Sequence, residues 1–226
     1  VSRQLIANCL VHFGQFEKAR SFLEKGVTDS PLDADAALAL GAFQLRVTFY
    51  IEKSTEGRKE AQINLLKAAK LDASRSNPFA LLGIWYEATG DLRRAEGCFR
   101  KSLKLDPCNP VAGRGLLRLC PSSDCQDILD VAINRSSPLN GWAWNAVGLN
   151  KAYREGDDSL AVVAILKALR CRDVALSDKE NLGVFYATPS SPGNISELST
   201  ALAEVGMCYR RLGRMTASIR AFHASI

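Results

Sequence analysis

The chain has 226 residues, of which 47% are hydrophobic and 23% are charged; its net charge is +5 and its mean hydropathy is −0.05. This composition, with only 8 prolines, favours a soluble intracellular α-helical protein. No stretch approaches the about 20 consecutive apolar residues of a membrane-spanning helix, so we expect no membrane partner.

Five segments along the chain share one pattern: a small residue, a large apolar residue four positions later, and another small residue three positions after that. They are Ala19/Leu23/Gly26, Ala61/Leu65/Ala68, Ala95/Phe99/Ser102, Ala161/Ile165/Ala168 and Ser218/Phe222/Ser225. A small residue on an earlier helix precedes each segment. These five residues are Ala7, Gly41, Gly83, Gly148 and Gly206. Because small residues allow two helices to approach closely, the pattern predicts a series of helical hairpins.

The first two hairpins differ in the length of their connection. At about 1–33, Ala7 and Ala19 are twelve positions apart. At about 34–74, Gly41 and Ala61 are twenty positions apart, which indicates an expanded hairpin.

The third hairpin, at 75–108, carries the most complete signature. Its residues are Phe79, Leu82, Gly83, Tyr86, Ala95, Phe99 and Pro107. These spacings are those of a tetratricopeptide repeat (TPR). We expect Gly83 and Ala95 to lie where the two helices cross, and Pro107 to stop the second helix. The resemblance implies an all-α fold, a TPR superhelical solenoid of antiparallel helix pairs.

The rest of the chain continues the series less regularly. A degenerate repeat fits 109–139, with Leu129 in the slot for a small residue. A further repeat fits 140–173, where Gly148 and Ala161 are thirteen positions apart, and an incomplete one, containing Tyr209, fits 199–226. Residues 174–198 are predicted to form a loop insertion. Because the series starts and stops within repeats, we expect a fragment of a longer solenoid.

No catalytic or metal-binding constellation is recognisable, so we predict that the chain is not an enzyme and holds no cofactor or metal. The two histidines, His12 and His223, fall near opposite ends of the series, and Gly113-Arg114-Gly115 lacks the context of a nucleotide-binding loop. The carboxylates Asp157 and Asp158 are most simply helix N-caps.

The first helix of each repeat is expected to line the inner face of the superhelix, where a protein partner would bind. The candidate residues of this groove are Asn77, Leu81, Ile84, Glu87, Trp142, Asn145, Leu149, Tyr153, Met207, Arg210 and Arg211. An alternative is a weak RNA-binding surface on the second helix of the third hairpin. Its basic residues are Arg93, Arg94, Arg100, Lys101 and Lys104.

The stretch from Arg94 to Asp173 resembles the TPR scaffold subunits of the superkiller (Ski) complex. The most specific elements are the string Gly97-Cys98-Phe99-Arg100-Lys101 and the string Trp142-Ala143-Trp144, with Gly148 six residues after Trp142. The resemblance implies a non-catalytic scaffold that holds an RNA helicase and WD-repeat subunits and assists the cytoplasmic exosome in 3′-to-5′ mRNA decay. It also implies a cytoplasmic location, with a nuclear pool as an alternative. A TPR scaffold of an unrelated assembly stays open.

Overall fold

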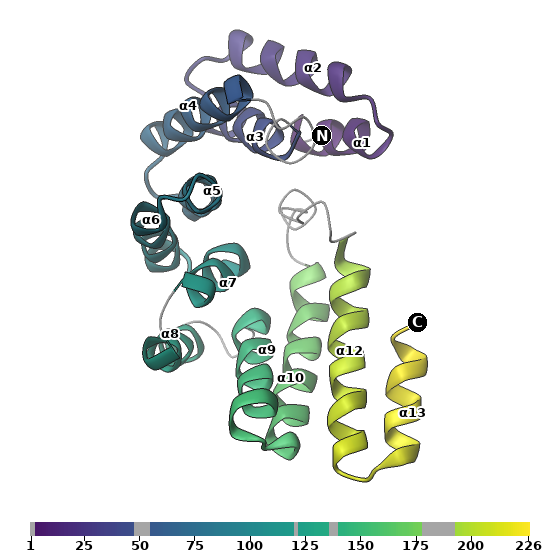
Figure 1. Ribbon diagram of the computed structural model, residues 1–226. Helices are drawn as coiled ribbons and strands as arrows, with labels where there is room; N and C mark the ends of the chain where they lie inside the picture. Colours follow the sequence, from purple (N-terminus) through teal and green to yellow (C-terminus); the bar gives the residue numbers. More distant parts are fainter. Residues whose placement is uncertain (1–2, 48–54, 120–121, 136–139, 178–192) are drawn as a thin grey trace. The chain divides into compact units, whose positions relative to one another are not determined.

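The computed structural model describes residues 3–47, 55–119, 122–135, 140–177 and 193–226 (Figure 1). These residues contain twelve α-helices and no strand. The predicted all-α fold is therefore confirmed. None of the described helices is both long enough and apolar enough to cross a membrane.

The helices belong to two compact units, which divide between α7 and α8. In the first unit α1 (Arg3–His12) packs on α2 (Phe16–Asp29), α3 (Ala34–Gln44) on α4 (Thr55–Leu71), and α5 (Ser76–Ala88) on α6 (Leu92–Leu105), while α7 (Pro110–Leu119) contacts α5 and α6. In the second, α8 (Ser122–Arg135) contacts α9 (Gly141–Asn150), α9 packs on α10 (Asp158–Ser177), and α12 (Gly193–Arg211) packs on α10 and on α13 (Met215–Ala224). The degenerate repeat at 109–139 combines α7 and α8, which belong to different units, so it stays a prediction.

The prediction of a loop over 174–198 was wrong at both of its boundaries. Helix α10 continues to Ser177, and α12 begins at Gly193. Residues 178–192 lie outside the described part of the chain. The loop boundaries were predicted from the Pro- and Ser-rich composition of this region and from the end of the repeat spacing. Neither feature forces a helix to end at Asp173 or prevents one from beginning before Ser199.

Each hairpin is held by the small residues of its two helices. The side chains of Ala7, Ala19, Ala61, Ala95 and Ala161 are completely buried. A Cβ atom added to Gly41, Gly83, Gly148 or Gly206 would lie within 2.9 Å of the large apolar residue on the following helix. The pairs of helices therefore touch at contacts that leave no room for a larger side chain.

The last hairpin departs from the signature at Phe222. Phe222 is the large apolar residue of the repeat pattern in this hairpin. In the four earlier hairpins the corresponding residue is at most 1% exposed, at Leu23, Leu65, Phe99 and Ile165. Phe222 is only half-buried, although its ring would lie 2.9 Å from a Cβ atom on Gly206. The physical reason is the number of neighbouring helices. Helix α13 packs mainly on α12, whereas the ring of Phe99 has α5 on one side and α7 on the other.

The tyrosines of the signature are also less buried than its small residues. Tyr86 is half-buried and packs against the core of the first unit, and Tyr209 is half-buried and packs against that of the second. Each ring therefore covers the edge of a core instead of filling its centre. Pro107 follows the end of α6 at Leu105 by two residues, which agrees with its predicted place after the helix.

The turn inside four hairpins uses a glycine with positive φ, a conformation that costs other residues free energy. These glycines are Gly14, Gly90, Gly156 and Gly213, with φ between 71° and 86°. In three of the turns, the N–H of the next residue donates to the carbonyl five positions earlier, as from Asp91 to Tyr86 at 2.9 Å. This arrangement satisfies a carbonyl at the end of the first helix.

Helix α7 completes the packing of the third hairpin through Gly115. The ring of Phe99, which is fully buried, lies between Gly83 on one side and Gly115 on the other. A Cβ atom on Gly115 would lie within 2.7 Å of three ring atoms. The glycine thus allows α7 to pack closely over the preceding hairpin.

Two buried serines in small-residue slots provide a matched test. The Oγ atom of Ser218 donates a 2.9 Å hydrogen bond to the carbonyl of Gly206, whereas the buried Oγ of Ser102 has no partner among the described residues. We expect Ser218→Ala to lower the free energy of unfolding by about 1 kcal/mol, and Ser102→Ala to leave it unchanged or raise it by up to about 1 kcal/mol. Urea unfolding followed by circular dichroism measures both. Equal losses in the two variants would contradict the expectation.

Candidate partner-binding surface

Two of the predicted groove residues are buried, so for them the prediction was wrong. Leu81 in α5 is 2% exposed and belongs to the hydrophobic core of the first unit, and Trp142 in α9 is 9% exposed. Helix α5 contacts α4, α6 and α7, and helix α9 contacts α8 and α10. Each helix is therefore buried on more than one face, and these side chains lie on buried faces. A partner cannot reach them in this fold.

The remaining candidates of the first unit lie on α5 and are tied to neighbouring residues. Asn109 donates a 3.0 Å hydrogen bond to the side chain of Asn77. Glu87 accepts two hydrogen bonds from Arg118 of α7, at 3.0 and 2.8 Å. Ile84 is half-buried against the core. The polar groups of this face therefore join α5 to its neighbours within the unit.

In the second unit, part of the candidate surface lies on a π-helix. After Asn150, helix α9 continues as a π-helix, η2 (Lys151–Glu155), which ends at Gly156. Here the N–H of Asp157 donates to the carbonyl of Lys151, six positions earlier rather than five, at 2.9 Å. The π-helix accommodates the extra residue between Gly148 and Ala161. Such insertions are frequent at functional sites.

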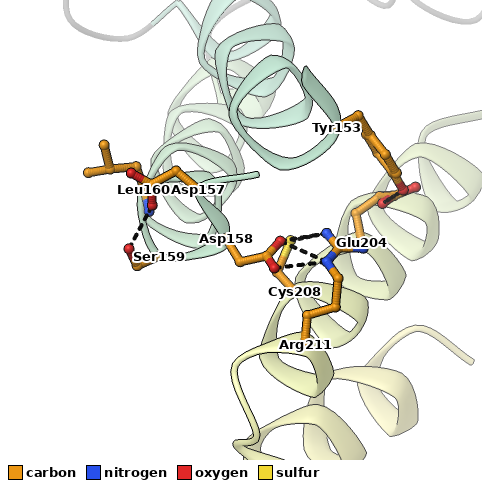
Figure 2. A network of polar contacts seen from close by, with 8 residues as sticks. All are labelled: Tyr153, Asp157, Asp158, Ser159, Leu160, Glu204, Cys208 and Arg211. Carbon is orange, nitrogen blue, oxygen red and sulfur yellow. Dashed lines mark hydrogen bonds and ion pairs between the residues drawn. The ribbon is translucent and has the colours of Figure 1, made fainter. Parts of the chain in front are cut away.

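Tyr153 of η2 and Arg211 of α12 are part of a polar network (Figure 2). The hydroxyl of Tyr153 donates to the carboxylate of Glu204 in α12. The guanidinium of Arg211 lies 5.7 Å from the centre of the Tyr153 ring, within the range of a cation–π contact. The network therefore joins η2 to α12 across a separation of 51 residues in sequence.

Arg211 also joins α12 to the first residue of α10. Its Nε atom lies 2.9 and 2.8 Å from the two carboxylate oxygens of Asp158, and its Nη2 atom lies 3.5 Å from the sulfur of Cys208 (Figure 2). Asp157 is the N-cap, because it accepts from the N–H of Leu160 at 3.0 Å. The N-cap prediction therefore holds for Asp157 and was wrong for Asp158, which pairs with an arginine distant in sequence.

The protonation states in this network favour a structural role over a catalytic one. Hydrogen bonds from Arg211 hold the pKa of Asp158 below its usual value, and the hydrogen bond to Glu204 raises the pKa of Tyr153. Burial, with further contributions from the hydrogen bond and charge of Asp158, raises the pKa of Cys208 to about 11. A thiol with that pKa is protonated at neutral pH and is a poor nucleophile.

The surface that stays available to a partner lies on η2 and α12. Tyr153 is 60% exposed, and Arg210 is exposed and forms no ion pair with a described residue. Asn145, Leu149 and Met207 are half-buried. In the second unit the structure thus places an aromatic ring and arginine side chains on two neighbouring elements. The sequence pattern missed Glu204 and Asp158, because nothing in their local sequence indicates their partners.

The basic residues of α6, considered above for RNA binding, are partly engaged within their own hairpin. Arg94 pairs with Asp91 at 3.3 Å, and Arg100 pairs with Glu96 at 2.8 Å. The Nζ atom of Lys101 lies 4.0 Å from the centre of the Phe79 ring. Arg93 and Lys104 are exposed. Intramolecular contacts of this kind compete with phosphate binding.

Neutralising Asp158 gives a pH-dependent test of the network. Because its pKa is lowered by folding, its contribution to stability is complete above the ordinary value of 3.8 and is lost as the pH falls through the lowered pKa. We expect Asp158→Asn to destabilise the second unit at neutral pH, with a loss that shrinks at acid pH. Urea unfolding across the acid range measures this. A loss that is independent of pH would contradict it.

Comparison with known proteins matches this architecture. Residues 79–110 match the family model for a tetratricopeptide repeat. Superkiller complex protein 3 of Mus musculus is 32% identical over 165 residues, which cover 69% of this chain and 10% of the mouse protein. The Homo sapiens protein of the same name is 29% identical over 163 residues, with the same coverage. The crystal structure of the APC/C hetero-tetramer Cut9–Hcn1 has a TM-score of 0.65 and 17% identity, covering 98% of this chain and 38% of that one.

The fold and the matched repeat define the class of the chain as a TPR solenoid, a fold that typically serves as a non-catalytic scaffold for protein interactions. The predicted resemblance to the TPR subunit of the superkiller complex is confirmed by the similarity to Superkiller complex protein 3. The chain spans about a tenth of the length of these relatives.

Proposed function

We propose that the chain is part of a scaffold subunit of a superkiller-type complex in the cytoplasm, which assists the exosome in 3′-to-5′ mRNA decay. The similarity to Superkiller complex protein 3, at 32% identity over 165 residues, carries the proposal. Its expected partners are an RNA helicase and WD-repeat proteins.

The geometry of the second unit supports a binding role. Tyr153 exposes most of its side chain while its hydroxyl is fixed by Glu204, and Arg211 is fixed by Asp158. A partner that contacts such side chains loses less side-chain entropy on binding than one that must order them. Tyrosine and arginine are also enriched at the energetic centres of protein interfaces. We infer that η2 and the last turns of α12 contact a protein partner.

Purification of the protein, tagged in its natural cells, tests the proposal. Co-elution of an RNA helicase together with WD-repeat proteins is expected. An Arg210→Glu variant should reduce their recovery, since Arg210 is exposed in the last turn of α12, which belongs to the proposed interface. Arg220→Glu on α13 makes the same charge change at another exposed position and should retain them. Recovery of a different set of proteins would indicate a TPR scaffold of an unrelated assembly and overturn the proposal.

A further inference from the structure

The second unit carries an open apolar pocket lined by residues of α9, η2 and α10. Its volume is about 230 Å³. It is lined by Trp144, Val147, Lys151, Leu160, Val163, Ala164 and Lys167. Leu160 and Val163 are 51% and 52% exposed, although both are large apolar residues. Branched side chains of α10 are thus left in solvent beside an aromatic ring of α9.

The same position exists in the first unit, where the α5–α6 hairpin has the same register. Trp144 lies four residues before Gly148, as Phe79 does before Gly83. Lys167 lies six residues after Ala161, as Lys101 does after Ala95. The two lysines make the same contact: each Nζ lies over the aromatic ring, at 4.3 Å from the Trp144 centre and 4.0 Å from the Phe79 centre. The two faces can therefore be compared residue by residue.

In the first unit a helix covers the α5 side of this face. Phe79 and Leu82 are 8% and 2% exposed, in one core with residues of α4. Gln62 of α4 donates to the hydroxyl of Tyr86 at 3.4 Å, and Trp85 donates to the backbone carbonyl of Arg58 at 2.8 Å. Trp144 and Val147, which correspond to Phe79 and Leu82, are only half-buried, although α8 contacts α9 as α4 contacts α5. The fold thus shows what fits this position: a helix with an apolar stripe.

The second helix of the hairpin differs in a way that enlarges the apolar surface. Leu160 and Val163 of α10 stand where α6 has Arg94 and Gly97. In α6 these positions carry no large apolar side chain. In α10 they extend the exposed apolar area from Trp144 across to the second helix. Solvent exposure of adjacent branched residues costs free energy, which burial under a partner would recover.

The rim of the pocket is basic. Lys151 is paired with Glu155 at 2.5 Å, whereas Lys167 contacts the Trp144 ring and forms no ion pair with a described residue. From Ser159 to Cys171, α10 carries no acidic residue, while it carries Lys167 and Arg170. A ligand with a carboxylate beside its apolar side chains would complement this charge.

We infer that this pocket binds an amphipathic helix of a protein partner, which inserts branched or aromatic side chains over Trp144, Leu160 and Val163 and places an acidic residue near Lys167. The inference rests on the proposed scaffold role in one respect, which is that the chain has a protein partner. It names neither a helicase nor an exosome subunit. Neither Tyr153 nor Arg210 lines the pocket, although Lys151 of η2 does.

Selection from a phage-displayed library of amphipathic helical peptides of about five turns tests the inference on the 226-residue chain. Selected peptides should share apolar residues with helical spacing and an acidic residue within one turn of them. Val163→Asp should weaken their binding by about tenfold or more, because the new carboxylate is buried in an apolar contact. Lys167→Glu should weaken the binding of peptides that carry the acidic residue. It should have a smaller effect on variants of these peptides in which glutamine replaces that residue.

Ile219→Asp is the matched control, because Ile219 is 55% exposed on α13 and lies outside the pocket. It should leave peptide affinity unchanged, and circular dichroism should give the same helix content for all variants. Peptides that bind Val163→Asp as tightly as the unmodified chain would overturn the inference. So would self-association that Val163→Asp abolishes, because the occupant would then be a second copy. Neither result depends on which proteins co-purify with the tagged protein, so the two proposals can fail separately.

Discussion

Replacement of Phe99 by alanine is expected to lower the free energy of unfolding of the first unit by about 3–5 kcal/mol. The ring is fully buried and lies between Gly83 of α5 and Gly115 of α7. Its removal would leave a cavity between helices that have no side chain at these two positions to fill it. Urea unfolding measures the loss, and hydrogen exchange in α5, α6 and α7 shows where protection is lost.

Leu92→Ala is the control on the same helix. Leu92 is 54% exposed at the start of α6, so its truncation should change the free energy of unfolding by no more than about 0.5 kcal/mol. A Phe99→Ala loss as small as that of the control would mean that the ring does not hold the three helices together.

The third hairpin illustrates how much of the fold the sequence predicts. Gly83, Ala95 and Phe99 are contact residues whose spacing follows from the geometry of two crossing helices, so a short stretch of sequence encodes them. The same reasoning applies to Gly41, Gly148 and Gly206, which face large apolar residues on the next helix. Contacts inside one hairpin are local, and they are the ones that a repeat signature records.

Contacts between successive hairpins could not be predicted from the spacing of residues within one hairpin. Gly115 contacts Phe99, which belongs to the preceding hairpin, so a search for small residues paired within one hairpin does not detect it. The half-burial of Phe222 has the same origin, because the signature records its contact with Gly206 but not how many helices surround the ring. The degree of burial at a repeat position therefore depends on neighbouring hairpins, which a signature within one hairpin does not describe.

The turns carry a further signal in the positions of their glycines. In three hairpins a glycine follows the small residue of the first helix by seven positions, and these glycines are Gly14, Gly90 and Gly213. Gly156 is one residue late because of the π-helix. Since each of these glycines has a positive φ, the spacing marks where the first helix ends.

The candidate site could be predicted only in part. Tyr153 and Arg211 were found because they lie on the first helices of their repeats, but their partners were not. The pairs Tyr153–Glu204 and Asp158–Arg211 join residues 51 and 53 positions apart, and they depend on how α12 lies beside η2 and α10. No local pattern fixes that placement. The burial of Leu81 likewise depends on tertiary neighbours rather than on the register of α5.

Gly83→Leu is expected to destabilise the first unit by about 3 kcal/mol, at the upper end of the usual range for overpacking. A Cβ atom at this position would already lie within 2.8 Å of three atoms of the Phe99 ring. The ring cannot move away, because Gly115 and the backbone of α7 lie on its other side. The two helices of the hairpin would have to separate. Urea unfolding measures the loss.

The control for this variant has the opposite expected sign. Gly97 lies on α6 where an added Cβ atom would have no neighbour within 4 Å, so Gly97→Leu should stabilise the unit by about 0.5–1 kcal/mol through helix propensity. The clash with the ring can then be isolated by combining Gly83→Leu with Phe99→Ala. If the ring is the obstacle, the new leucine fills the vacated space and the double variant loses less stability than the sum of the two single losses. Additive losses would show that the clash lies with the backbone of α6 instead.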